Sequence, residues 1–216
     1  MFFCASLMPM PVTIMIDPAG HAQQTGRKLW SSFERAETLK CAEALKAAFE
    51  KYADSVRIIL TRVPGQEIVS LQNASFANRL PEVREGGFFL RLQCYKEDAE
   101  KPQIFIHYLE LDPLIDKAQH LDQPHAFVPI NQAHFHNIRR SSEIAHALKN
   151  FLESNDYPKN FDCHGAYGLP LSPLMGIMAP AILVEIGLCA DNQWQLFVDP
   201  LVQGLCAALS ITKERT

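Results

Sequence analysis

The chain has 216 residues, of which 48% are hydrophobic and 20% are charged, and its formal net charge is −4. This length and composition predict one domain with a sizeable core, and the lack of a long basic run argues against a nucleic-acid partner. The six cysteines are widely spaced without a CxxC pair, which predicts reduced core residues rather than a disulfide-stapled secreted domain.

The first eleven residues, MFFCASLMPMP, are apolar, but they lack the basic region and the cleavage site of a complete signal peptide. Two prolines interrupt this segment before it reaches membrane-spanning length, so we expect no transmembrane segment. We interpret residues 1–11 as an apolar N-terminal segment and a candidate remnant of an export signal. Residues 12–216 are predicted to form a single domain.

A strand–helix–strand unit is predicted at the start of this domain. The runs VTIMID (12–17) and VRIILTR (56–62) are short and rich in β-branched residues, which is typical of strands. The helix between them is expected to begin near Ser31 or Ser32. Its apolar face consists of residues spaced three or four apart: Leu39, Ala42, Leu45, Phe49 and Tyr52. Such a unit favours a parallel strand pair with a right-handed crossover.

Helices and strands alternate along the rest of the chain. A second helix is expected to begin near Ser70 and to end before Pro81. The other predicted elements are strands over 87–95, 103–111 and 179–188, a helix over 141–154 and a closing helix over 194–211. Residues 112–140 have no clear period and predict a long loop or lid. The sequence therefore predicts an α/β fold with a doubly wound, mostly parallel twisted sheet and helices on both faces.

Three polar side chains are candidates for chemistry. His21 follows the first strand and Glu34 lies in the first turn of the next helix, although on spacing alone a loop histidine and a capping box in SSFE (31–34) are the commoner explanations. Glu185 interrupts the apolar run AILVEI, where an ionised carboxylate is costly unless an ion pair or a metal compensates it. Glu185 is therefore either a structural ion-pair partner or a general base that takes a proton from metal-bound water.

Several motifs occur in the order of a known family. They are IDPAGHA (16–22), the Glu34 segment, LTR (60–62), SL (70–71), AN (77–78) and PAILVEIG (180–187). Together they resemble the zinc-dependent N-acetylmuramoyl-L-alanine amidases, cell-wall enzymes of the AmiA, AmiB and AmiC type. The resemblance implies that His21 and Glu34 bind zinc and that Glu185 is catalytic.

One departure from the family pattern matters more than the extra residue before His21 and the alanine at Ala22. The stretch FFLRLQC (88–94) places Gln93 where the family has its third zinc-ligand histidine. An amide oxygen is a weak ligand for zinc compared with imidazole. His107 on the following strand could replace the missing ligand, and so could His134 or His136, although AHFH (133–136) is more simply explained as a solvated part of the loop.

The resemblance implies a zinc-dependent hydrolase that cleaves the amide between N-acetylmuramic acid and L-alanine in peptidoglycan. It also implies a Zn²⁺ cofactor and a peptidoglycan or muropeptide partner. The expected location is then the cell envelope or periplasm, and a regulatory protein is a second candidate partner. Gln93 motivates the alternative, a metal-poor, non-catalytic protein of the same fold that binds muropeptide or a partner protein. A metallopeptidase that acts on another amide would use the same residues.

Overall fold

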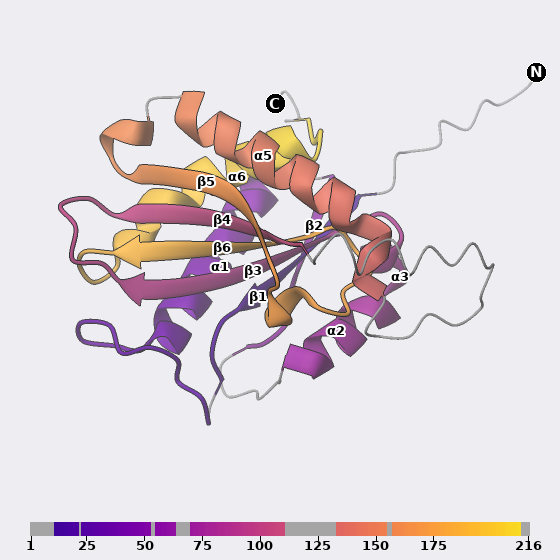
Figure 1. The fold of residues 1–216 in the computed structure, drawn as a ribbon, viewed down its shortest axis with the longest axis horizontal. Coiled ribbons are helices and arrows are strands. Elements are labelled where there is room, and N and C mark those ends of the chain that lie inside the picture. The colour runs from indigo at the N-terminus through magenta and orange to yellow at the C-terminus, as the bar shows by residue number, and fades with distance from the viewer. Residues whose placement is uncertain are drawn as a thin grey trace, which may run out of the picture.

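The computed structural model describes residues 11–21, 23–52, 55–63, 70–110, 133–154 and 157–212. In this part of the chain, a six-stranded sheet has the strand order β2-β1-β3-β6-β4-β5 (Figure 1). The strands are β1 (Val12–Pro18), β2 (Val56–Leu60), β3 (Phe88–Lys96), β4 (Gln103–Leu109), β5 (Asp162–Leu169) and β6 (Ala181–Leu188). The α-helices are α1 (Glu34–Tyr52), α2 (Ser70–Arg79), α3 (Pro81–Arg84), α5 (Ile138–Ser154) and α6 (Val198–Ala208).

The sheet is mostly parallel. β1 pairs in parallel with both β2 and β3, and β3 pairs in parallel with β6. β4 reverses this direction because it runs antiparallel to β6, and β5 then pairs in parallel with β4. The predicted parallel strand–helix–strand unit and the predicted mostly parallel sheet are confirmed.

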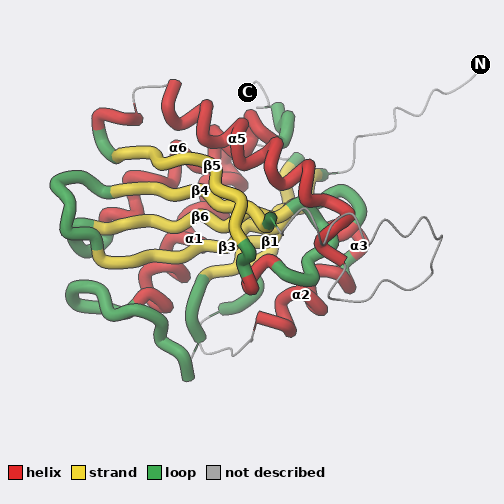
Figure 2. Tube along the Cα trace, in the orientation of Figure 1, coloured by secondary structure: helices red, strands yellow, loops and turns green. Residues whose placement is uncertain are grey.

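Helices cover both faces of the sheet, as the sequence predicted (Figure 2). Successive side chains of a strand point to opposite faces, so a strand such as β1, β3 or β6 contributes to two cores. α1, α5 and α6 pack on one face, and α2 and α3 pack on the other. Representative buried residues are Leu45, Leu90, Leu148, Val184 and Leu205 in the first core and Met15, Ala77, Val83, Phe89 and Leu183 in the second.

The helix α1 begins at Glu34, slightly later than the predicted start at Ser31 or Ser32. On its expected apolar face, Ala42, Leu45 and Phe49 are fully buried, whereas Leu39 and Tyr52 are half-buried.

The fold differs from the prediction in several segments. The edge strand β5, with the sequence DCHGAYGL, was missed because two glycines and half-exposed side chains give it neither an apolar run nor a clean alternation. Residues 133–140, predicted as part of the lid, instead form the 3₁₀-helix η1 (Ala133–Asn137) and the first turn of α5. Residues 112–132 of the predicted lid lie outside the described residues.

Of the helices that the structure describes, none combines the length and the apolar composition that a membrane crossing needs. The cysteines within the described ranges are free thiols: Cys41, Cys94, Cys163, Cys189 and Cys206. Burial, together with the nearby Glu37, raises the pKa of Cys41 to about 12, so this thiol is unreactive at neutral pH.

Candidate functional site

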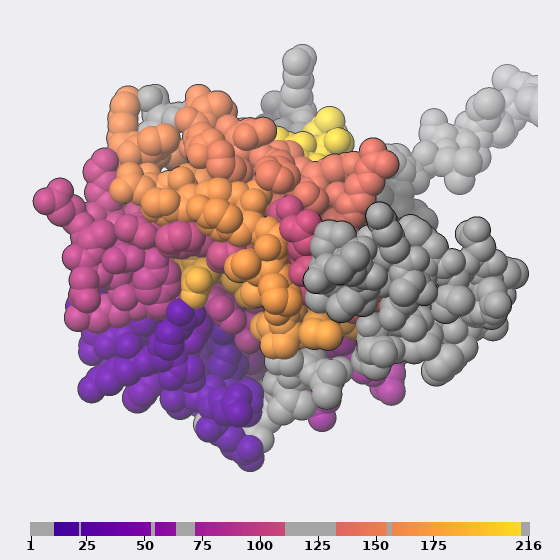
Figure 3. Space-filling model, viewed as in Figure 1, coloured from indigo at the N-terminus to yellow at the C-terminus, as the bar shows by residue number. Residues whose placement is uncertain are grey.

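A pocket of about 480 Å³ lies where β1, β2 and β3 end. The carboxyl ends of parallel strands are the usual place for a ligand site in an open α/β sheet. The polar residues that line it are Asp17, His21, Gln24, Arg27, Glu34, Thr61, Arg62, Asn73, Arg91 and Gln93. On the surface, the loop before α1 (indigo) meets β3 and β4 (magenta) and the segment after β5 (orange) near this edge (Figure 3).

Asp17, at the end of β1, forms the buried base of the pocket. Its Oδ1 accepts a hydrogen bond of 2.6 Å from the Thr61 hydroxyl, and its Oδ2 accepts one of 2.9 Å from Asn73 Nδ2. The Arg91 guanidinium on β3 pairs with the same Oδ2. One carboxylate therefore joins β1, β3, the end of β2 and α2.

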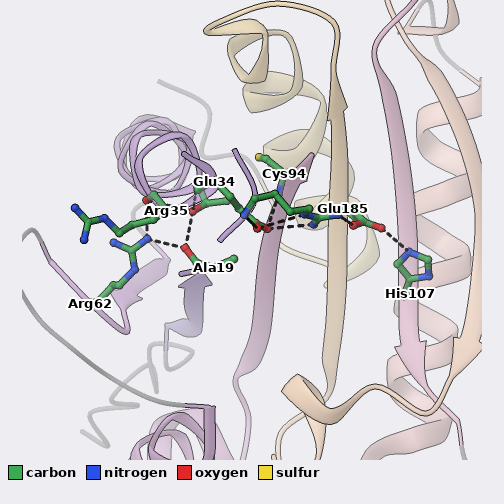
Figure 4. Close-up of polar contacts among 9 residues, drawn as sticks. Ala19, Glu34, Arg35, Arg62, Cys94, His107 and Glu185 are labelled. Carbon is green, nitrogen blue, oxygen red and sulfur yellow. Dashed lines mark hydrogen bonds and ion pairs between the residues drawn. The ribbon is translucent and has the colours of Figure 1, made fainter. Parts of the chain in front are cut away.

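Arg62 fixes the loop that follows β1. Its Nε donates to the carbonyl of Pro18 at 3.2 Å, and its Nη2 donates to those of Ala19 and Arg35 at 2.9 and 2.8 Å. Thr38 also donates to the Ala19 carbonyl, at 2.9 Å. These contacts hold the loop before His21 against the start of α1 (Figure 4).

His21 lies in a tight turn after Gly20. Gly20 has φ +76°, and an added Cβ would lie 2.7 Å from the Arg35 Cβ, so the turn requires glycine. The His21 backbone N–H donates to the Gln24 carbonyl at 2.8 Å. Its Nδ1 is buried, without a hydrogen-bond partner among the described residues. The imidazole therefore lines the pocket with an unused nitrogen.

Glu34 points to the end of β3 and is not part of a capping box. Its Oε1 accepts a hydrogen bond of 3.2 Å from the backbone N–H of Cys94 (Figure 4). Ser31, the residue that such a box would use, instead donates through Oγ to Asp191 at 2.6 Å. Glu34 is only 5% exposed, and it lines the same pocket as His21.

Arg27 connects Glu34 to Glu185, a link that the sequence analysis missed. Its Nη1 donates to Glu185 Oε1 at 2.7 Å, and its Nη2 donates to Glu34 Oε1 at 3.1 Å (Figure 4). Arg27 lies in the non-periodic loop before α1, where a single arginine has no motif to identify it.

Glu185 lies on β6 beside Gln93 of β3 and Phe105 of β4, its partners in the sheet register. Its side chain is 24% exposed, so it is less buried than the apolar run predicted. The contact with His107, whose Nε2 lies 3.8 Å from Oε2, and the hydrogen bond from Arg27 lower the pKa of Glu185 against the opposing effect of burial. A carboxylate with a lowered pKa is a weak base at neutral pH.

The other candidate ligands lie apart from the pocket lining. His107 contacts Glu185, and its ring packs near those of Phe105 and Tyr167, with centroids 6.2 and 5.9 Å away. His134 is 4% exposed in η1, where its Nδ1 accepts a 3.4 Å hydrogen bond from the Gly176 N–H. The expectation that AHFH is solvated is therefore wrong for His134, because η1 places its imidazole against the Gly176 backbone.

The burial of His134 predicts a pH dependence of stability. Burial lowers the pKa of His134 in the native state. In the unfolded chain the same histidine is protonated near its ordinary pKa of 6.5, so protonation favours the unfolded state. The free energy of unfolding is therefore expected to fall as the pH drops through 6.5 towards the lower native pKa. Urea denaturation between pH 7.5 and 5 should show a shallower decline in His134→Asn, and parallel declines would contradict this assignment.

The donor set does not fit a catalytic zinc ion. Zinc in a hydrolytic site takes three protein ligands and keeps one open position. Among residues 11–110 and 133–212, apart from the gaps given above, no three His, Cys, Asp or Glu side chains gather as a metal site. His21 and Glu34 share the pocket, but Gln93 supplies only a neutral amide, and the Arg27 guanidinium already contacts Glu34.

No protein-family model and no curated protein sequence matches the chain. Solved structures do match it in fold. An N-acetylmuramoyl-L-alanine amidase from Clostridium difficile 630 has a TM-score of 0.63 at 17% identity, over 93% of this chain and 97% of that one. AmiC2 of Nostoc punctiforme has a TM-score of 0.64 at 16% identity, over 92% and 97%. The CwlD amidase from Clostridioides difficile, solved with the GerS lipoprotein, has a TM-score of 0.57 at 15% identity, over 93% and 95%.

The predicted resemblance is confirmed at the level of the fold. These matches extend over nearly the whole of each chain, and the proteins concerned are amidases.

Proposed function

We propose that this protein binds peptidoglycan fragments in the pocket at the ends of β1 and β3 and does not cleave them by the metal-dependent route. The observation that carries the proposal is the composition of the pocket. It keeps polar residues at the carboxyl ends of β1, β2 and β3 in a fold shared with amidases, but it has Gln93 where the resemblance implies a third zinc-ligand histidine. A fold shared with named amidases supports a muropeptide as the ligand and the cell envelope as the location.

The pocket chemistry suits a ligand rich in amides and hydroxyls. Gln24 and Gln93 line the pocket, and amide side chains both donate and accept hydrogen bonds. A cavity of about 480 Å³ is within the range of small-ligand sites, which are roughly 300–1,000 Å³. A muramyl peptide, with its acetamido, hydroxyl and peptide groups, matches this lining.

Calorimetric titration with N-acetylmuramoyl-L-alanyl-D-isoglutamine tests the proposal. Saturable binding is expected in the presence of EDTA, with the probe recovered intact by mass spectrometry. Gln93→Leu should weaken binding by about tenfold, since losing a pocket hydrogen bond costs roughly 1 kcal/mol or more. Arg139→Ala on α5, whose side chain is 94% exposed, is the control that should bind as the wild type does. Absence of saturable binding would refute the proposal.

The second candidate is the zinc-dependent amidase that the resemblance implies, with His21 and Glu34 as ligands and Glu185 as general base. The buried Nδ1 of His21, which has no hydrogen-bond partner among the described residues and lies in the pocket that Glu34 also lines, favours it. This candidate would be established instead if the zinc-loaded wild type released the L-alanyl peptide from the probe. Glu185→Gln should then fail to release the peptide while keeping its fold. A protein partner, like the lipoprotein solved with CwlD, is a further alternative ligand.

A further inference from the structure

The strongest unexplained contact in the site is the bridge that Arg27 makes between two glutamates. Four donors of this one residue are used. Nη2 donates to Glu34 Oε1 at 3.1 Å, while Nε and the backbone N–H donate to Glu34 Oε2 at 3.3 and 3.1 Å. Nη1 donates to Glu185 Oε1 at 2.7 Å. Figure 4 shows the resulting row of contacts from Glu34 to Glu185 and on to His107.

The charges explain why a cation is needed at this point. Glu34 is 5% exposed and Glu185 is partly buried, and an ionised carboxylate in such a place requires a compensating charge. Arg27 supplies this charge, because a guanidinium stays protonated at neutral pH and this one pairs with both carboxylates. A planar guanidinium can bond two carboxylates in fixed directions at once.

The loop is shaped to bring Arg27 against Glu34. The preceding residue, Gly26, has φ +73°, and a Cβ there would lie 2.6 Å from Glu34 Oε2. A larger side chain would therefore push the loop away from the carboxylate. On its other side, the Arg27 guanidinium lies over the Tyr95 ring, 5.4 Å from the centroid. Backbone and ring contacts both hold the guanidinium between the glutamates.

We infer that Arg27 is the resident cation of this site and takes the place of a bound metal ion, so that an internal Glu34–Arg27–Glu185 bridge holds the two carboxylates. Gln93 is consistent with this arrangement, because it lies beside Glu185 in the sheet. Its neutral amide adds neither a further negative charge nor an imidazole ligand there. The inference goes beyond the proposed function, since it concerns what holds the site together and not which ligand the pocket accepts.

The inference is tested by measuring zinc binding alone. Equilibrium dialysis of the purified full chain against zinc chloride, with elemental analysis, compares the wild type, Gln93→His, Arg27→Ala and the double variant Arg27→Ala/Gln93→His. The wild type and Gln93→His are expected to retain no stoichiometric zinc, because the guanidinium is still present. The double variant is expected to bind about one zinc per chain, at least tenfold more tightly than Gln93→His, since it frees Glu34 and adds a third ligand beside His21.

Thermal unfolding supplies a second readout. Arg27→Ala is expected to melt below the wild type, and zinc should raise the melting temperature of the double variant but not of the wild type. Stoichiometric zinc in the wild type or in Gln93→His, or a double variant that binds no more tightly than Gln93→His, would overturn the inference. If removal of Arg27 prevents folding, Gln93→His alone decides the matter, because tight zinc binding with the guanidinium in place contradicts the assignment. Muropeptide binding, measured separately in EDTA, reports on the proposed function.

Discussion

Replacing Asp17 with alanine is expected to lower the free energy of unfolding by about 3–5 kcal/mol, the usual cost of removing one partner of a buried ion pair. Asp17 is 2% exposed, and its partner Arg91 has a side chain that is 12% exposed. The substitution would leave the Arg91 charge uncompensated and would remove the acceptor of Thr61 and Asn73. Urea denaturation measures the change.

A matched control is available at the surface. Arg57 and Glu82 also form an ion pair, at 3.0 Å, but both side chains are substantially exposed. Glu82→Ala should therefore cost about 0–1 kcal/mol. The double variant Asp17→Leu/Arg91→Leu should recover part of the loss, because it removes both buried charges. An Asp17→Ala protein as stable as Glu82→Ala would show that the Asp17 network contributes little.

Arg62→Met is expected to lower the free energy of unfolding by about 2–4 kcal/mol and to abolish muropeptide binding. Methionine keeps most of the volume of the stem but donates no hydrogen bond, so the carbonyls of Pro18, Ala19 and Arg35 lose their charged donor. The loop that places His21 in the pocket would then be released.

Arg57→Met on β2 is the control for Arg62→Met, because its side chain is 60% exposed and it should change stability by less than about 1 kcal/mol. Arg62→Lys should fall between the two, since an ammonium keeps the charge but cannot reproduce the guanidinium fork. Equal stabilities of the two methionine variants, with calorimetric binding retained in Arg62→Met, would contradict the assigned role.

Local patterns were sufficient to predict most of the fold. The β-branched runs of β1 and β2 and the apolar run of β6 have the pattern expected of strands packed in a core. The spacing of Ala42, Leu45 and Phe49 identifies α1. β5 could not be found in this way, since an edge strand is only partly buried and needs no regular pattern.

The candidate site was predicted only in part. His21 and Glu34 do line one pocket, and Arg27, which also lines it, pairs with Glu185. Arg27 itself was not predictable, because its contact with Glu185 joins residues 158 positions apart, and that proximity exists only after β6 pairs with β3. His107, by contrast, was among the candidate ligands, and it reaches Glu185 because β4 pairs with β6 in the sheet.

The bond from the Cys94 N–H to Glu34 also has a consequence for the backbone of β3 beyond its pairing with β1. β1 pairs with β3 only as far as Pro18 and Leu92, so the next stretch of β3 would offer a backbone donor to an added strand. The Glu34 carboxylate occupies that donor. A peptide that added to the sheet at Cys94 would therefore have to displace Glu34 from this donor.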